Sequence, residues 1–308
     1  MKVLITGGSG YIGESVFRQV NKLYPGETFI NFDNLSRKNY SFFINNTFDK
    51  IDARFEKGDL LDTKRLNTLL QDIDVIVHLA GLVTTPFADH TPHLFEQNNH
   101  WGTSSLVSAI EQSQVKRVIY LSTATVYGNT EEPVSEAHRP NPETFYCVSK
   151  YQAEKQLQRI VNDREVYILR SGNVYGYNSS MRMDAFVNKF MFEAHFLNKI
   201  KITGDGEQYR PVIHVEKLAH VIAKLIKADV KPDVYNVAEH NLTINQVGEQ
   251  IQTIYPEMDM VFSSQNMPMR SLQMEVPGQL AEVMNLPTNN FEDELHGIKD
   301  HFAFRSNH

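Results

Sequence analysis

A glycine-rich turn near the start of the chain constrains the fold more than any other feature of the sequence. The segment Thr6–Gly13 follows the short apolar run Val3–Ile5 and leads directly into a helical pattern. The N-terminus of such a helix offers free N–H groups and a favourable dipole to an anion. Gly7 allows the tight turn, Gly10 lets the backbone approach a pyrophosphate, and Gly13 lets the helix pack on the strand. A glycine loop without a ligand is the alternative, but the strand–turn–helix context favours a dinucleotide site.

Short apolar runs alternate with helical patterns along the first half of the chain. Runs without in–out alternation are typical of parallel strands that helices cover on both faces. This predicts an α/β fold, a Rossmann-type doubly wound parallel sheet that binds ligands at the carboxyl ends of its strands. The runs are Val3–Ile5, Thr28–Phe32, Val75–Leu79, Val118–Leu121 and Val166–Leu169, and the helical patterns include Ile12–Leu23, Thr103–Gln112 and Tyr146–Val161.

The rhythm of the sequence changes after about residue 170. Residues 1–170 and about 212–238 are predicted to form the dinucleotide-binding domain, because strand–helix–strand patterning resumes over 211–237. Residues of about 171–211 and 239–308 are predicted to form a smaller, discontinuous α/β domain for the substrate.

Composition and charge exclude several classes of protein. A chain of 308 residues, 41% of them hydrophobic, buries enough core to fold without a structural metal. Cys147 is the only cysteine, which fits a reducing cytoplasm. The net charge of −7 argues against nucleic-acid binding, and no apolar run approaches the length of a membrane span or a signal segment. His90 and His93 lie in a polar loop without metal-ligand spacing, so no metal is expected.

The end of the second predicted strand indicates which dinucleotide is bound. Asp33 follows the turn by about twenty residues, where a carboxylate accepts bonds from ribose hydroxyls and repels a 2′-phosphate, so NAD is favoured over NADP. The neighbouring Arg37 and Lys38 could instead neutralise that phosphate, but they lie in a polar loop and are expected to be solvated. Asp59 ends the third strand and is interpreted equally as an adenine contact or as a turn or helix cap.

Tyr146 and Lys150 are candidate catalytic residues. Their spacing of four puts both side chains on one face of a predicted helix. A free tyrosine has a pKa of about 10, so a pKa near 7 requires about 4 kcal/mol of stabilisation of the phenolate. The Lys150 ammonium and the positive nicotinamide ring of NAD⁺ would supply much of it. Such pairs are common in helices, and this one is informative because a dinucleotide turn lies upstream.

The ordered motifs resemble the extended short-chain dehydrogenase/reductase family, in particular its NAD-dependent nucleotide-sugar epimerases and dehydratases of the UDP-galactose 4-epimerase type. The resemblance spans nearly the whole chain, which makes it far more specific than any single motif. The matching segments are Thr6–Gly13, Asp33-Asn34-Leu35, Gly58-Asp59, His78–Gly81, Asn98-Asn99 with Gly102-Thr103, Leu121–Gly128, Tyr146–Lys150, Leu169-Arg170 with Asn173–Gly176, Gly204–Gly206, and Arg210 with Ile213–Val215.

The resemblance implies a role for each matching residue. Tyr146 would be the acid/base, Lys150 would tune it, and Thr123 would bond the sugar hydroxyl. An arginine such as Arg210 suits phosphate because its planar fork binds oxygens in pairs. The alternatives are a surface salt bridge for Arg210, a strand-end cap for Asn173 and a bond to buried backbone for Thr123. The implied cofactor residues are Gly7, Gly10, Tyr11, Ile12, Gly13, Asp33, Asn34, Asp59, Leu60, Leu79, Ala80, Gly81, Asn99, Tyr146 and Lys150, and the implied substrate residues are Thr123, Asn173, Asn188, Arg210 and Arg270.

The resemblance further implies a cytoplasmic homodimer that epimerises a nucleotide-diphosphate sugar, at C4, through a transient bound keto-sugar and NADH. A dehydratase, decarboxylase or reductase on the same scaffold is the alternative. A non-catalytic NAD(H)-binding sensor is disfavoured because Tyr146 and Lys150 are both present. Neither nucleic acid nor a membrane is an expected partner.

The residues after Thr123 bear on the choice between epimerase and dehydratase. Dehydrating relatives carry an Asp-Glu pair there, and decarboxylating relatives keep a glutamate in the second place. This chain has Ala124 and Thr125, and neither side chain titrates near neutral pH. The pattern favours an epimerase. The alternative is a dehydratase whose acid comes from elsewhere in the chain, for instance Asp89 or Glu143.

Overall fold

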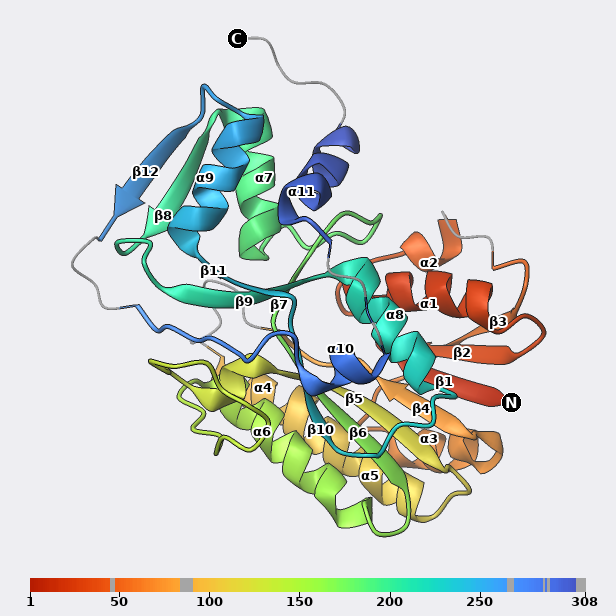
Figure 1. Cartoon of the computed structure of the whole chain (residues 1–308). Coiled ribbons are helices and arrows are strands. Elements are labelled where there is room, and N and C mark those ends of the chain that lie inside the picture. Colours follow the sequence, from red (N-terminus) through yellow and green to blue (C-terminus); the bar gives the residue numbers. More distant parts are fainter. Residues whose placement is uncertain (45–47, 84–90, 265–268, 285, 287–288, 303–308) are drawn as a thin grey trace.

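The computed structural model of the chain describes residues 1–44, 48–83, 91–264, 269–284, 286 and 289–302. Its centre is a seven-stranded sheet in the order β10-β6-β5-β4-β1-β2-β3, with every neighbouring pair parallel (Figure 1). The predicted α/β fold is therefore confirmed. The strands are β1 (Lys2–Thr6), β2 (Thr28–Asp33), β3 (Asp52–Lys57), β4 (Val75–His78), β5 (Arg117–Thr123), β6 (Glu165–Ser171) and β10 (Val234–Val237).

The strand order reverses between β1 and β4. The chain runs outward from β1 to β3 and then returns to place β4 on the other side of β1. A doubly wound sheet opens a crevice at such a switch point, beyond the carboxyl ends of its strands. The glycine turn after β1 therefore lies where a ligand is expected.

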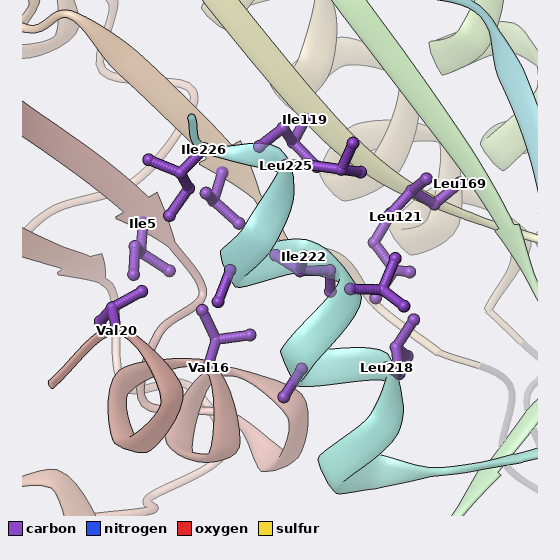
Figure 2. Packing of buried hydrophobic residues seen from close by; sticks show 14 of the residues in the cluster. Ile5, Val16, Val20, Ile119, Leu121, Leu169, Leu218, Ile222, Leu225 and Ile226 are labelled. Carbon is purple, nitrogen blue, oxygen red and sulfur yellow. The ribbon is translucent and has the colours of Figure 1, made fainter. Parts of the chain in front are cut away.

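Helices cover both faces of the sheet and bury its apolar strands. One face packs against α1 (Tyr11–Leu23) and α8 (Val215–Leu225), and the other against α3 (Thr63–Leu69), α5 (Gly102–Glu111) and α6 (Phe145–Leu157). Figure 2 shows side chains of the first face, with Val16 and Val20 of α1 and Leu218, Ile222 and Leu225 of α8 gathered near Ile5, Ile119, Leu121 and Leu169 of the strands.

A second, smaller core lies beyond the sheet. It is built from α7 (Phe186–Leu197), α9 (Ile244–Ile254) and α11 (Phe291–Asp300), packed with the paired strands β8 (Lys199–Thr203) and β12 (Asp259–Ser263). A three-stranded sheet of β7 (Asn173–Tyr175), β9 (Tyr209–His214) and β11 (His240–Thr243) lies between the two cores (Figure 1). The division into a dinucleotide domain and a substrate domain stays a prediction.

Shorter elements complete the chain. The strand–helix–strand pattern over 211–237 corresponds to β9, α8 and β10, and the side chain of His214 at the end of β9 accepts the N–H of Glu216 and caps α8. Asp89 and His90 lie outside the described residues. Among those described, no helix is long and apolar enough to cross a membrane. The remaining elements of the described residues are α2 (Ser41–Ile44), α4 (Pro92–Phe95), a π-helix (Glu96–Trp101), α10 (Gln279–Met284) and three 3₁₀ turns (Leu70–Asp72, Ala124–Tyr127 and Gln158–Ile160).

Candidate active site

A crevice of about 1100 Å³, counting the part open to solvent, lies at the switch point of the sheet. Its lining brings together segments that are far apart in the sequence: the glycine turn, the ends of β2 and β3, and the segment after β4. Twelve of the residues predicted to bind a cofactor line it, namely Gly7, Gly10, Tyr11, Ile12, Gly13, Asp33, Asn34, Asp59, Leu60, Leu79, Ala80 and Gly81.

The glycines of the turn are required by close backbone contacts. A Cβ at Gly7, whose φ is +72°, would lie 2.7 Å from the backbone of Ala80, and one at Gly13 would lie 2.6 Å from the backbone of Gly8. Gly10 precedes the first residue of α1 and donates its N–H to the Gly7 carbonyl at 3.0 Å. The first turn of α1 thus opens onto the crevice, and larger side chains would displace the turn.

The carboxylate of Asp33 is fixed beside this turn. Its Oδ2 accepts the N–H of Ser9 at 3.1 Å and its Oδ1 accepts the N–H of Leu35 at 2.7 Å. Burial raises the pKa of Asp33, and these two backbone bonds act in the opposite direction. Each oxygen retains a lone pair with which it can accept a bond from a ligand hydroxyl.

Asp59 and Arg37 extend the same wall of the crevice. Asp59 accepts bonds from the Asn34 side chain at 2.9 Å and from the N–H of Leu61 at 3.0 Å. Its carboxylate therefore stabilises the turn after β3, and the residue also lines the crevice. The sequence pattern suggested that Arg37 is solvated. Its side chain is exposed, yet it also lines the crevice, and burial against the wall lowers its pKa.

Tyr146 and Lys150 lie on α6, whose first residues face the carboxyl end of β5. Lys150 is buried, and its Nζ donates to the Leu121 carbonyl at 2.6 Å and lies 4.2 Å from the centre of the Tyr120 ring. Hydrogen bonding by Thr123 acts to lower the pKa of Tyr146. The end of β5 therefore holds both predicted catalytic side chains.

The electrostatics of this pair follow from its burial. Burial lowers the pKa of Lys150 to about 7, and the charge of Glu154 acts in the opposite direction. Burial raises the pKa of Tyr146 to about 12 with a contribution from Cys147, and Arg182, the bond from Thr123 and Arg37 act to lower it. Additional positive charge beside the phenol would favour the phenolate.

Buried polar residues behind the pair hold it in place. Glu154, fully buried one turn after Lys150, accepts bonds from Ser122 and from the guanidinium of Arg170, whose Nη2 is 2.7 Å away. Asn99 lies in the π-helix, and its amide binds the Leu82 N–H at 2.7 Å and the Leu82 carbonyl at 2.9 Å. Asn99 therefore supports the wall from behind.

Two of the predicted substrate residues are arginines, Arg210 and Arg270. Arg210 donates to the carbonyls of Tyr209 and Arg270, and burial together with the charge of Arg270 lowers its pKa to about 10. Two cations close together favour an anion between or beside them. Arg270 itself pairs with Glu143 at 2.8 Å.

The asparagines of the predicted substrate set have internal partners. Asn173 donates to the Pro211 carbonyl at 3.1 Å. Asn188 is fully buried and bonds to the Gly176 N–H, the Tyr11 hydroxyl and the Arg182 carbonyl. In this structure it supports the chain around Arg182.

Arg182 is a residue that the sequence reasoning missed. It lines the crevice, is held in a two-bond pair with Asp184 at 3.0 and 2.7 Å, and its charge acts on Tyr146. The only available signal was an Arg-x-Asp run ahead of a helix, which does not say where the arginine points. Within the described ranges, no group of His, Cys, Asp or Glu side chains is arranged to hold a metal ion.

Comparisons with known proteins agree on one family. A family model described as NAD dependent epimerase/dehydratase family matches residues 3–238. The UDP-glucose 4-epimerase of Bacillus subtilis is 30% identical over 264 residues, which cover 77% of each chain. Human dTDP-D-glucose 4,6-dehydratase is 26% identical over 312 residues, covering 96% of this chain and 84% of the relative.

Solved structures show the same architecture. UDP-N-acetylglucosamine 4-epimerase from Methanobrevibacter ruminantium, in complex with UDP-N-acetylmuramic acid, has a TM-score of 0.83 at 26% identity and 97% coverage of both chains. DesIV from Streptomyces venezuelae, a dTDP-glucose 4,6-dehydratase with NAD and TYD bound, has a TM-score of 0.83 at 21% identity and 98% coverage of both chains. At that identity the second likeness shows the fold alone.

Proposed function

The chain belongs to the NAD dependent epimerase/dehydratase family, and from this premise we propose that it is a 4-epimerase of a nucleotide-diphosphate sugar. It is an NAD-dependent enzyme of nucleotide-sugar metabolism, and the choice of epimerisation is our proposal. The observation that carries the proposal is that Ala124 and Thr125 follow Thr123, because neither side chain titrates near neutral pH.

The residues of the crevice fit NAD. The open first turn of α1 suits a pyrophosphate, and the glycines leave room for a close approach. Asp33 lies where it can accept bonds from a ribose and repel a 2′-phosphate. When bound, NAD supplies a reversible two-electron oxidation of the sugar carbon, so the reaction passes through a keto-sugar and regains its cofactor.

Tyr146 exchanges the proton of the reacting sugar hydroxyl. As a phenolate it removes this proton, and as a phenol it returns a proton to the oxygen at the end of the cycle. Thr123 acts as a hydrogen-bond partner that lowers the pKa of this phenol. The buried Lys150 contributes positive charge on the next turn of the helix, in its protonated form.

Arg210 and Arg270 are proposed to bind the diphosphate of the substrate. Burial is the main cause of the lowered pKa of Arg210, and repulsion by the charge of Arg270 acts in the same direction. A diphosphate would relieve this repulsion and accept paired hydrogen bonds. Asn173 and Asn188 remain proposed substrate residues, although each has protein partners here.

The residues after Thr123 support epimerisation over dehydration. Eliminating water from a 4-keto sugar requires an acid or base that takes the C5 proton and protonates the leaving hydroxyl. The side chains of Ala124 and Thr125 cannot do this near neutral pH, and the Thr125 hydroxyl is bonded to Thr123 and Cys147. Glu143, an alternative acid that lies among the described residues, forms a salt bridge with Arg270.

Product analysis in deuterated water tests this proposal. A 4-epimerase yields an epimer without solvent deuterium on carbon, because the hydrogen removed from C4 returns to the same carbon. Deuterium at C5 with loss of the C6 oxygen would show a dehydratase and overturn the assignment. A panel of nucleotide sugars resolved by NMR would identify the sugar and the nucleotide in the same experiment.

Substitution of Tyr146 tests the assignment of the site. Tyr146→Phe should lower turnover by about two to four orders of magnitude, the contribution of a positioned proton donor, and leave NAD binding nearly intact. Lys150→Met should lower turnover and weaken NAD binding as well, because the ammonium lies beside Gly81, which lines the crevice. Near-normal turnover in Tyr146→Phe would refute the site.

We further propose that the protein is a cytoplasmic homodimer that pairs through α5 and α6. The large apolar side chains of Trp101 and Phe145, at the starts of these two helices, are 51% and 54% exposed in the single chain. Burying such surface is favourable by about 25 cal/mol for each Å². Light scattering on the purified protein measures the oligomeric state, and a monomer at micromolar concentration would contradict the proposal.

A further inference from the structure

A line of hydroxyl and thiol groups leads through the protein to Tyr146. The Thr144 hydroxyl donates to Sγ of Cys147 at 2.9 Å, and this thiol donates to Oγ1 of Thr125 at 3.3 Å. Oγ1 of Thr125 lies 2.9 Å from Oγ1 of Thr123, and Thr123 is close enough to Tyr146 for hydrogen bonding to lower the pKa of the phenol. The groups come from the end of β5 and the 3₁₀ turn after it, and from the N-cap and first turn of α6.

The protons of this line have one consistent direction. Each hydroxyl or thiol has a single proton to donate. Because Thr125 accepts the proton of the Cys147 thiol, its own proton is free to point to Thr123. Oγ1 of Thr123 also accepts the N–H of Thr125 at 3.3 Å, so its remaining proton points outward to Tyr146. Every donor in the line therefore faces the phenol oxygen.

We propose that Thr125 and Cys147 are positioning residues that turn the Thr123 hydroxyl toward Tyr146 and stabilise the phenolate through a cooperative hydrogen-bond chain. The inference rests on the acid/base role proposed for Tyr146. It assigns position 125 a part in proton transfer, although its threonine does not titrate. Both residues are largely shielded from solvent, so water does not readily replace the chain.

Other groups also act on Tyr146 and must be separated from the chain. Arg182, from the segment before α7, and Arg37, from the loop after β2, act to lower the pKa of Tyr146, whereas the charge of Cys147 on the same helix acts to raise it. The ring of Phe95 packs edge-on against the tyrosine at 6.0 Å between centroids. A substitution at position 125 removes a link of the chain and leaves all of these groups in place.

Thr125→Val tests the chain because it removes one hydroxyl and keeps the shape of the side chain. In the NAD-loaded enzyme, the acid limb of the pH–rate profile should move up by about half a unit to one unit, the size of one hydrogen bond. Turnover below that limb should fall by about three- to ten-fold, since it follows the phenolate fraction. Phenolate absorbance during a pH titration, with Tyr146→Phe as the blank, should show the same shift.

Conservative variants separate the hydroxyl from the fold. Thr125→Ser retains the donor and should titrate as the wild-type protein does. Cys147→Ala and Cys147→Ser both remove the charge effect by which Cys147 raises the pKa of Tyr146, so the difference between the two variants measures the hydrogen bond. The pKa of Tyr146 should be about a few tenths of a unit higher in Cys147→Ala than in Cys147→Ser, because a thiol is a weak donor and serine retains a donor at this place. If Thr125→Val does not fold, the two Cys147 variants decide the question.

Two results would overturn the chain. One is a Tyr146 titration unchanged in Thr125→Val, or equal in Cys147→Ala and Cys147→Ser. The other is a shift in Thr125→Ser as large as that in Thr125→Val. If Tyr146→Phe abolishes turnover while Thr125→Val leaves the pH–rate profile unchanged, the hydrogen-bond chain is refuted and the acid/base role of Tyr146 is not. If Tyr146→Phe retains turnover, the proposed function itself fails.

Discussion

Protonation of His78 should loosen the floor of the cofactor crevice. This residue ends β4 and is fully buried. Its Nδ1 lies 2.7 Å from Oγ1 of Thr6, which also accepts the N–H of Ala80, and its Nε2 lies 2.9 Å from Oγ1 of Thr103. Burial, together with the charge of Lys150, lowers the pKa of His78 from 6.5 to about 3.

The direction of the effect follows from proton linkage. Between pH 6.5 and about 3 the unfolded chain binds a proton at His78 that the folded protein does not, so stability falls as the pH is lowered through this range. At 1.36 kcal/mol for each unit of pKa difference, the full loss is about 5 kcal/mol, and about 2 kcal/mol is already lost at pH 5.

Urea unfolding with NAD at a fixed saturating concentration measures this effect. Carboxylates also contribute to acid sensitivity, so the informative quantity is the difference between the wild-type protein and His78→Asn. Asparagine can hydrogen-bond one of the two threonines but does not titrate. The stability of the wild-type protein relative to His78→Asn should therefore decrease by about 2 kcal/mol from pH 7 to pH 5. Parallel pH curves for the two proteins would refute the reasoning.

Two further predictions concern the cofactor and the buried ion pair. NAD should bind at least about ten-fold more tightly than NADP, roughly 1.4 kcal/mol, and Asp33→Ala should reduce this preference; equal affinities in wild-type calorimetry would make Arg37 a phosphate ligand instead. Glu154→Gln should lower the free energy of unfolding by about 3–5 kcal/mol, because Arg170 is left buried without its charged partner. A loss in urea unfolding of less than about 1 kcal/mol would contradict this.

The sequence predicted those parts of the site that depend on neighbours in the chain. The glycine turn and Asp33 are specified by local backbone geometry and by strand length, so their places in the crevice could be foreseen. The pairing of Tyr146 with Lys150 depends only on helical spacing. These features need no knowledge of how distant segments pack.

The contributions of Arg37 and Arg182 could not be predicted in this way. Both act on Tyr146 from loops whose paths are set by tertiary packing. Asn188 illustrates the same limit, since a polar residue at the start of a helix can face a ligand or the interior. Here its amide is bonded to the Tyr11 hydroxyl and to the Arg182 carbonyl. Its role as a substrate ligand stays a prediction.

The geometry at the end of β5 links catalysis to stability. Helical spacing puts Tyr146, Lys150 and Glu154 on one face of α6. Three successive positions of β5 act on them: the Leu121 carbonyl accepts a bond from Lys150, the Ser122 hydroxyl donates to Glu154, and Thr123 acts to lower the pKa of Tyr146. Because one strand end fixes all three, α6 cannot slide without breaking the contacts of the buried Glu154. The ion pair of Glu154 with Arg170 therefore anchors the helix from which the proposed acid/base projects.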